Sequence, residues 1–268
     1  MRYGLSAANF GTYSEPARVA ELATTAEGAG WDGLFLWDHL AFAWGPPAGD
    51  PWLLLAAAAH TTERLRLGTH VTPLPRRRPH VLAVTVATLD RLSGGRVVFG
   101  AGLGGNEREF AAFGEESDER VRADQLDEAL ELLRRWWRGE SVTQSGPHYV
   151  VDDVALAPLP LQQPLPIWIG GNAPRPVRRA ARYDGWAANS SYIDRMTLTP
   201  DDVAERLTTI DKLRGGLDGF DVVVHGLSDL GDPATYREAG ATWWLENVHD
   251  VRGPFDEMLA LVAEGPPR

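Results

Sequence analysis

Short apolar runs alternate along the whole chain with longer segments of helical periodicity. The apolar runs are residues 3–8, 33–37, 65–71, 96–102, 166–171, 185–190, 220–226 and 241–248. Each run is mostly apolar on both faces, which is typical of strands in a buried parallel sheet. Each is followed by a segment with helical spacing. The pattern therefore predicts eight β-then-α units, an α/β fold of the (β/α)8 TIM barrel type, in one domain over residues 1–268.

Local signals mark where the helices begin and where the barrel is interrupted. Asp50-Pro51, Thr199-Pro200 and Asp232-Pro233 each pair an N-cap residue with proline at the first helical position. The stretch 140–165 lies between the fourth helix and the fifth strand and has the composition of a hairpin followed by a proline-rich connection. We expect a short hairpin insertion between strands 4 and 5.

Composition and charge narrow the function classes. The net charge of −11 argues against a general nucleic-acid binder, and the absence of cysteine excludes disulfides and thiolate chemistry. The first ten residues lack the apolar core of a signal peptide, and no run of about 18 apolar residues predicts a membrane span. We expect a cytoplasmic protein with no nucleic-acid or membrane partner.

One motif resembles a dinucleotide-binding fingerprint. Gly100, Gly102 and Gly105 form G-x-G-x-x-G directly after an apolar run. In a βαβ dinucleotide unit, a second strand ending in Asp or Glu follows about 20 residues later. Here residues 118–137 have helical spacing instead, so the context does not fit. The glycines are predicted at the C-terminal end of the fourth strand, where barrel active sites are built; a tight turn without a ligand is the alternative.

Polar side chains follow four predicted strands at what would be one rim of the barrel. The segments are Trp37-Asp38-His39 after the second strand, Thr69-His70 after the third, Asn106, Glu107 and Glu109 after the glycines of the fourth, and Gly170-Gly171-Asn172 after the fifth. His39 is a candidate general acid or base, and a packed histidine is the alternative. Asp38 either orients His39 or caps the next loop.

Other candidates concern the substrate and the source of the chemistry. We assign Phe10, Phe42 and Trp44 to a substrate pocket, with core packing as the alternative for the last two. The run Arg76-Arg77-Arg78 is interpreted as a solvated helix entrance rather than a phosphate site. The histidines lack metal-ligand spacing, so no metal is expected. No nucleophile–base pair is visible in the sequence, which favours a bound cofactor.

Several segments resemble a known family. They are WDHL at 37–40, the long segment 69–114, LPIWIGGNAPRPVRRAARYDGW at 165–186 and AGATWWLEN at 239–247. The chain resembles the bacterial luciferase-like superfamily of flavin- and deazaflavin-dependent oxidoreductases. The segment 69–114 is the most specific, because a proline–arginine helix start, TLDRLSGGR and a glycine-rich strand end occur there in fixed order.

The resemblance implies FMN or its deazaflavin analogue, coenzyme F420, at the C-terminal face of a (β/α)8 barrel. It places His39 near the reactive ring, a cis non-proline peptide at Thr69-His70 and a small residue, Gly102, under the ring. The implied cofactor phosphate lies on the backbone N–H groups of residues 170–172, where a helix begins at Pro174. The cofactor-binding set is Asp38, Thr69, His70, Gly102, Leu103, Gly104, Asn106, Gly170, Gly171, Asn172 and Arg175.

The chain departs from the family at Leu103. Luciferases carry arginine there and deazaflavin-dependent sugar-phosphate dehydrogenases carry glutamate, so neither subfamily's substrate is carried over; Arg175 is the candidate for the missing charge. The sequence slightly favours an FMN-dependent monooxygenase of a small organic substrate over an F420-dependent hydride-transfer enzyme. A non-catalytic flavin-binding relative is the alternative of another class.

The expected partners follow from the same resemblance. They are a small-molecule substrate, a separate flavin reductase or NAD(P)H, and a second copy of the chain. The homodimer rests on the resemblance and on the ten tryptophans, some of which would cover an interface.

Overall fold

The structure is a computed structural model that describes residues 1–41, 45–192 and 194–267. Phe42 and Trp44, which the sequence assigned to a substrate pocket, lie outside the described residues.

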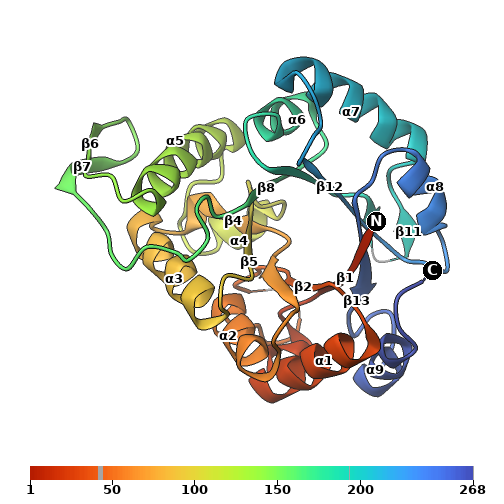
Figure 1. Cartoon of the computed structure of the whole chain (residues 1–268). Helices are drawn as coiled ribbons and strands as arrows, with labels where there is room; N and C mark the ends of the chain where they lie inside the picture. The colour runs from red at the N-terminus through yellow and green to blue at the C-terminus, as the bar shows by residue number, and fades with distance from the viewer. Residues whose placement is uncertain (42–44, 193, 268) are drawn as a thin grey trace.

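Eight parallel strands close into a barrel surrounded by helices (Figure 1). They are β1 (Arg2–Ala7), β2 (Gly33–Leu36), β3 (Arg66–Thr69), β5 (Val97–Gly102), β8 (Ile167–Gly170), β9 (Gly185–Ala188), β12 (Asp221–Gly226) and β13 (Trp243–Val248). Pairing of β1 with β13 and of β3 with β5 closes the ring. The predicted barrel is confirmed, and each of its eight strands falls within a predicted apolar run to within one residue.

The longer helices cover the outside of the barrel in chain order, whereas the short α4 lies over the strand ends (Figure 1). The helices are α1 (Pro16–Ala29), α2 (Pro51–Thr61), α3 (Pro79–Leu92), α4 (Glu107–Ala111), α5 (Glu119–Trp137), α6 (Pro174–Ala180), α7 (Pro200–Arg214), α8 (Pro233–Glu238) and α9 (Phe255–Ala263), with 3-10 turns η1 (Gly11–Ser14) and η2 (Leu74–Arg76). The side chains of Asp50, Thr199 and Asp232 accept backbone N–H bonds at the starts of α2, α7 and α8, as predicted. No helix in the described part of the chain is both long and apolar enough to cross a membrane.

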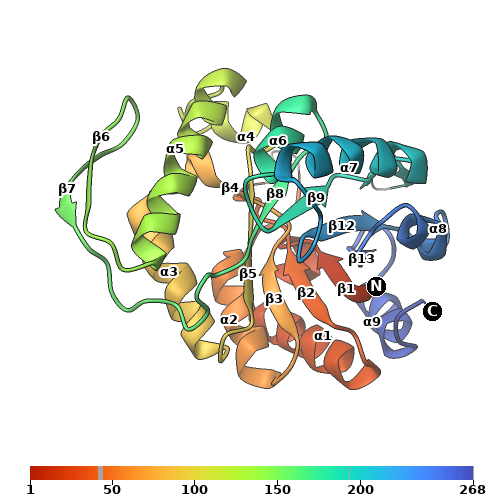
Figure 2. The same ribbon diagram turned by 45° about the horizontal axis from the view of Figure 1, so that its top comes forward.

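The predicted insertion is an antiparallel hairpin of β6 (Val142–Ser145) and β7 (Val150–Val154), which stands away from the barrel beside α5 (Figure 2). Glu128 of α5 attaches it by accepting hydrogen bonds from the Gln144 side chain and from two backbone N–H groups of the hairpin loop. Three short strands lie near the rim: β4 (Thr72–Pro73) beside β5, and β10 (Ser191–Tyr192) paired with β11 (Arg195–Met196).

The interior of the barrel is filled with side chains at its N-terminal end. Its apolar layer consists of Phe35, Val98, Trp168, Ala187, Val223, Trp243 and Leu245. Below it, the carboxylate of Asp221 accepts hydrogen bonds from Trp168 Nε1 and Trp243 Nε1, both at 3.1 Å, and from Arg2. Because this end is closed, a ligand can approach the barrel interior only from the C-terminal rim.

Most tryptophans belong to the core of the single chain. Those buried within it are Trp31, Trp52, Trp136, Trp137, Trp168, Trp186, Trp243 and Trp244. These eight side chains are therefore not available to cover an interface, and the homodimer stays a prediction.

Candidate functional site

The ends of the parallel strands bring the predicted site residues to one rim. Trp37, Asp38 and His39 follow β2, and Thr69 ends β3. The glycines of β5 and β8 lie between these strand ends and β9. The predicted meeting of these segments at one face of the barrel is therefore observed.

A cis non-proline peptide lies after β3, between His70 and Val71. The sequence placed it one bond earlier, at Thr69-His70, which was wrong. The reason is that the strand ladder continues through His70, whose backbone N–H donates to Leu36 O at 2.8 Å. Thr69 is likewise held in the sheet, because its hydroxyl donates to Gly100 O at 3.0 Å.

The side chain of Val71 occupies a notch made by three strand glycines. A Cβ at Gly102 would stand 2.4 Å from Val71 Cγ2, and one at Gly170 would stand 2.9 Å from the same atom. A Cβ at Gly100 would stand 1.9 Å from Thr69 O. The G-x-G part of the motif therefore makes room for the segment after β3, whereas Gly105 has nothing within 4 Å of its Cβ position.

His39 is held through both its backbone and its ring. The fully buried side chain of Asn9 accepts from His39 N at 3.0 Å and donates to His39 O at 2.7 Å. The same amide donates to Gly49 O, so it also fixes the far end of the segment after β2. The Nδ1 atom of His39 lies 2.9 Å from Oε2 of the buried Glu109. The carboxylate in contact with the imidazole is therefore that of Glu109 and not that of Asp38.

Asp38 is paired with Arg77 instead. Its Oδ1 atom lies 2.6 Å from Arg77 NH2, and Arg77 NH1 also reaches Asp50 at 3.2 Å. Burial raises the pKa of the Asp38 carboxyl, and the Arg77 charge acts against this shift. The interpretation of the arginine run as a solvated entrance was wrong for Arg76 and Arg77, because nearby carboxylates draw both side chains inward; only Arg78 is exposed.

Aromatic side chains form one wall beside His39. Phe10 is 5% exposed, and its ring lies edge-on to Trp37 and His39 at centroid distances of 5.7 and 6.3 Å. The ring of Trp37 also packs against that of His249, with the two ring centroids 5.6 Å apart. The structure therefore brings Phe10 and Trp37 together beside His39 and adds His249 to this wall.

A buried polar cluster lies on the opposite side, at the ends of β9, β12 and β13. His225 Nδ1 lies 3.0 Å from Ser191 Oγ, its Nε2 lies 3.1 Å from Asn189 Oδ1, and Asn247 donates to Ser191 at 2.7 Å. The rings of His225 and His70 meet with centroids 4.8 Å apart. Burial lowers the pKa of His225 to about 4, and burial together with His225 lowers that of His70 well below its usual value.

The residues predicted to hold a cofactor phosphate are partly engaged within the protein. The Gly171 N–H donates to Ala187 O at 3.3 Å, and the Asn172 side chain exchanges hydrogen bonds with the backbone of Asn189. Arg175 points to α5, where it pairs with Asp124 and Asp127.

The β5–α4 segment is held by hydrogen bonds and by packing. Asn106 caps α4 by accepting from Arg108 N at 3.2 Å. The backbone oxygens of Leu103 and Gly104 accept from the buried Arg122, and the Leu103 side chain lies against the core.

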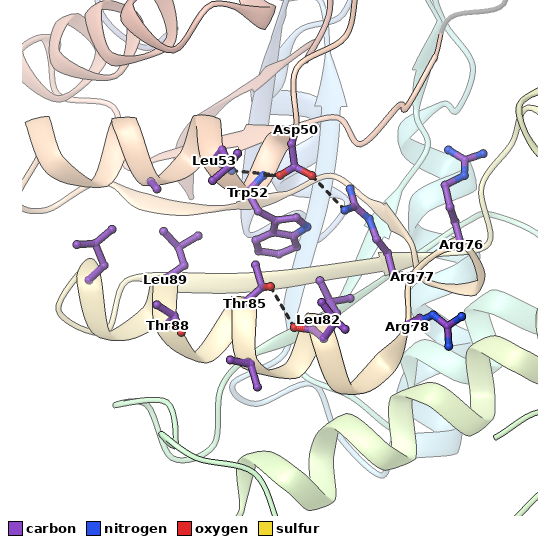
Figure 3. Close-up of a pocket in the computed structure, with 14 residues that line it drawn as sticks. Asp50, Trp52, Leu53, Arg76, Arg77, Arg78, Leu82, Thr85, Thr88 and Leu89 are labelled. Carbon is purple, nitrogen blue, oxygen red and sulfur yellow. Dashed lines mark hydrogen bonds and ion pairs between the residues drawn. The ribbon is translucent and has the colours of Figure 1, made fainter. Parts of the chain in front are cut away.

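A groove of about 640 Å³ lies elsewhere, between α2 and α3 on the outside of the barrel (Figure 3). Exposed apolar residues line it, among them Leu53, Val81, Val84 and Leu92. Arg77 stands at one end, bound to Asp50 (Figure 3). None of the strand-end residues lines the groove, so we do not treat it as the candidate site.

Sequence reasoning gave no role to three residues of the site: Asn9, Glu109 and Arg77. Asn9 lies two residues after the end of β1, and its position one residue beyond an apolar run was the available signal. Glu109 was visible after the glycines, but its contact with His39 joins residues 70 positions apart and has no local signature. Within the described residues, no group of three or more histidine, aspartate or glutamate side chains is arranged to hold a metal ion.

Curated relatives cover much of this chain. It is 36% identical over 195 residues to an F420-dependent glucose-6-phosphate dehydrogenase of Nakamurella multipartita, an alignment that spans 70% of this chain and 55% of the relative. It is 35% identical to an F420-dependent hydroxymycolic acid dehydrogenase of Mycobacterium tuberculosis, over 66% of this chain and 50% of the relative. The chain thus spans about half the length of the curated relatives it matches.

Solved structures share the fold. An F420-dependent secondary alcohol dehydrogenase, in complex with an F420-acetone adduct, aligns with a TM-score of 0.82 at 18% identity over 99% of this chain and 98% of that one. The monooxygenase RslO1 of Streptomyces bottropensis aligns with a TM-score of 0.80 at 22% identity over 98% and 96%. The family model of the luciferase-like monooxygenases matches residues 1–252. This chain therefore belongs to the luciferase-like monooxygenase family.

Proposed function

We propose that the chain is an F420-dependent oxidoreductase that transfers a hydride between the deazaflavin and a small organic substrate. The observation that carries the proposal is that the two curated relatives described above, at 36 and 35% identity, are named F420-dependent dehydrogenases. This support reverses the slight preference of the sequence interpretation for an FMN-dependent monooxygenase. A separate flavin reductase or NAD(P)H belongs to that FMN alternative.

The rim suits a planar, largely apolar ring system. Val71 is partly exposed above the three glycines that leave room for it, so it offers an apolar surface supported from below. The Nε2 atom of His70 is buried without a hydrogen-bond partner. A buried polar atom of this kind lowers the stability of the fold unless a ligand or a water molecule forms the hydrogen bond. A deazaflavin ring carries carbonyl and N–H groups that meet this need. We therefore propose that Val71 and His70 contact the cofactor, beside Thr69, Gly102 and Gly104.

When bound, F420 supplies hydride transfer, and the protein supplies orientation and proton handling. His39 lies at a strand end with its ring fixed on one side. In this proposal its imidazole takes the proton of a substrate hydroxyl during oxidation and returns it during reduction. Phe10 and Trp37 exclude water from one side of this position.

The phosphate end of the cofactor is proposed to lie at the loop after β8. The N–H of Gly171 is used within the sheet, so the donors we assign are the backbone of Asn172 and the side chain of Asn106. Arg175 would contribute only after leaving Asp124. A comparison of F420 with its deazaflavin chromophore lacking the phosphate tests this separately, because equal affinity for both would remove the phosphate site from this loop.

The substrate class is not carried over from the relatives that act on glucose 6-phosphate. Leu103 stands where the resemblance places a glutamate in sugar-phosphate dehydrogenases, and it lies against the apolar core. Arg76 and Arg77 are engaged by carboxylates of the chain itself. We propose an uncharged alcohol, ketone or related small molecule.

Fluorescence titrations with F420 and FMN, each oxidised and reduced, test the cofactor. We expect F420 to bind at least about tenfold more tightly than FMN. The His39→Ala variant should keep its F420 affinity within about twofold and lose turnover on the order of 100-fold. His60→Ala, at the exposed end of α2, is the matched control and should change neither. Tighter binding of FMN contradicts the proposal, and F420 binding without turnover of any alcohol or ketone favours the non-catalytic alternative.

We also propose that the chain forms a homodimer, as the family resemblance implies. With eight tryptophans in the core, this proposal rests on the resemblance alone. Light scattering at micromolar concentration tests it, and a monomer mass across the concentration range contradicts it.

A further inference from the structure

The contact between His39 and Glu109 joins two strand ends of the barrel. Nδ1 of His39 lies 2.9 Å from Glu109 Oε2, and the carboxylate side chain is 3% exposed, whereas that of His39 is 27% exposed. His39 follows β2 and Glu109 belongs to α4, after β5, so the contact is made by the folded barrel and not by local sequence. A buried carboxylate on one ring nitrogen restricts how the imidazole can carry its proton.

Glu109 is itself held firmly. Its neighbour Phe110 is enclosed between the guanidinium groups of Arg76 and Arg122, at 4.3 and 4.1 Å from the ring centroid. The Arg76 NH1 atom lies 3.6 Å from Glu109 Oε2, which supplies the opposite charge that a buried carboxylate requires. Arg76 in turn forms an ion pair with Glu115, whose Oε2 atom lies 3.1 Å from Arg76 Nε. These contacts place the carboxylate of Glu109 beside His39 and give it a nearby positive charge.

We infer that Glu109 is a positioning residue that fixes the proton of neutral His39 on Nδ1. The carboxylate oxygen can only accept, so the neutral ring donates Nδ1–H to it and carries its lone pair on Nε2. This inference rests on the proposed function, in which His39 takes the substrate proton.

The consequence for alcohol oxidation balances in atoms and electrons. The O–H bond of the alcohol breaks and its proton goes to His39 Nε2. The C–H bond breaks with its electron pair, which passes as hydride to the oxidised deazaflavin, and the C=O bond forms. The imidazolium produced keeps its Nδ1–H···Glu109 bond, so Glu109 stabilises the charge that develops on His39.

A structural role for Glu109 predicts something different. If Glu109 served only to anchor α4, its replacement would lower the stability of the protein but would leave the tautomer of His39 unchanged. In a free histidine side chain the neutral ring prefers to carry its proton on Nε2. An Nδ1–H tautomer of His39 would therefore report the hydrogen bond to Glu109 and not the packing of α4. Long-range 1H–15N spectra of protein labelled with 15N-histidine distinguish the two nitrogens directly, without cofactor or substrate.

The experiment compares the wild type with Glu109→Leu and Glu109→Gln at a pH where imidazole is neutral. We expect the Nδ1–H form of His39 in the wild type and the Nε2–H form in Glu109→Leu. Turnover with F420 should fall on the order of 100-fold in Glu109→Leu and less in the isosteric Glu109→Gln, with F420 affinity within about twofold. Glu107→Leu, at an exposed position of the same helix, is the matched control and should leave tautomer and turnover unchanged.

An Nε2–H tautomer in the wild type overturns the inference, and this measurement does not depend on any variant folding. An unchanged tautomer in a folded Glu109→Leu variant also overturns it. Failure of the wild type to bind F420, with the Nδ1–H tautomer observed, instead contradicts the proposed cofactor and leaves the positioning role intact. The two failures are therefore distinguishable.

Discussion

Val71 Cγ2 lies 2.4 Å from the point where a Cβ on Gly102 would stand. Two carbon atoms that are not bonded to each other do not approach this closely, so any side chain at residue 102 must displace Val71. The strand end of β5 and the segment after β3 are thus shaped for each other.

The first prediction concerns this contact. Gly102→Ala should push Val71 out of its notch and so alter the surface proposed for the cofactor ring. We expect F420 affinity to fall at least about tenfold, with a small loss of stability because part of Val71 is exposed. Fluorescence titration measures the affinity. Gly105→Ala is the matched control, since nothing lies within 4 Å of its Cβ position, and equal affinities of the two variants would contradict the prediction.

The second prediction concerns Asn9. Asn9→Ala leaves the backbone N–H and C=O of His39 and the C=O of Gly49 without the partner that the amide provides. We expect a loss of about 2 kcal/mol in the free energy of unfolding, and a lower turnover because His39 is no longer fixed. Urea unfolding and single-turnover kinetics measure the two effects. Retention of both would show that the amide is dispensable.

The third prediction concerns acid stability. Burial lowers the pKa of His225 to about 4 from 6.5, so between these values the unfolded chain binds a proton that the native chain does not. Stability from this group is complete above pH 6.5 and is lost as the pH falls through 4. The loss is roughly 1.4 kcal/mol per pH unit for one histidine. His70 acts in the same direction.

Urea unfolding from pH 7 to pH 4.5 tests this behaviour. His225→Asn should reduce the pH dependence by about one proton, whereas His80→Asn, at an exposed position, should leave it unchanged. An identical slope in His225→Asn and the wild type would refute the prediction.

The fourth prediction concerns a buried arginine at the opposite end of the barrel. Arg96 donates to the backbone oxygens of Ser93, Leu65, Ala59 and Thr62 and to the Thr62 hydroxyl. Arg96→Met leaves these acceptors unpaired and should cost about 2–4 kcal/mol of unfolding free energy. Arg91→Met, which loses one exposed hydrogen bond, should cost less than about 1 kcal/mol. Thermal unfolding of both variants decides whether the buried network stabilises the fold as expected.

The barrel could be predicted from sequence because its signals are local. Apolar runs predict buried strands, and pairs such as Asp50-Pro51 predict helix starts, independently of the rest of the chain. Eight repeats of the same pattern then define the closed sheet. His39 and Phe10 were predictable for a related reason, since a residue just after a parallel strand must reach the rim.

The partners of these residues could not be predicted, because they come from distant segments. His39 meets Glu109 and Asp38 meets Arg77 only after β2 and its neighbours are assembled. The arginine run was misread because three adjacent charges are usually solvated, and nothing local shows that carboxylates enclose two of them. The predicted position of the cis peptide was one bond too early, because the hydrogen bonds between β3 and β2 continue through His70.

Arg77 and Asn9 together have a consequence for how this enzyme family can diversify. Arg77 binds Asp38 and Asp50, and Asn9 binds His39 and Gly49, so both ends of the intervening stretch are anchored to the barrel. Because the anchors lie outside the stretch itself, we expect the backbone of His39 to keep its place when the stretch is exchanged for that of a relative. Grafting such a stretch onto this scaffold would test whether substrate preference can change while the affinity for F420 stays the same.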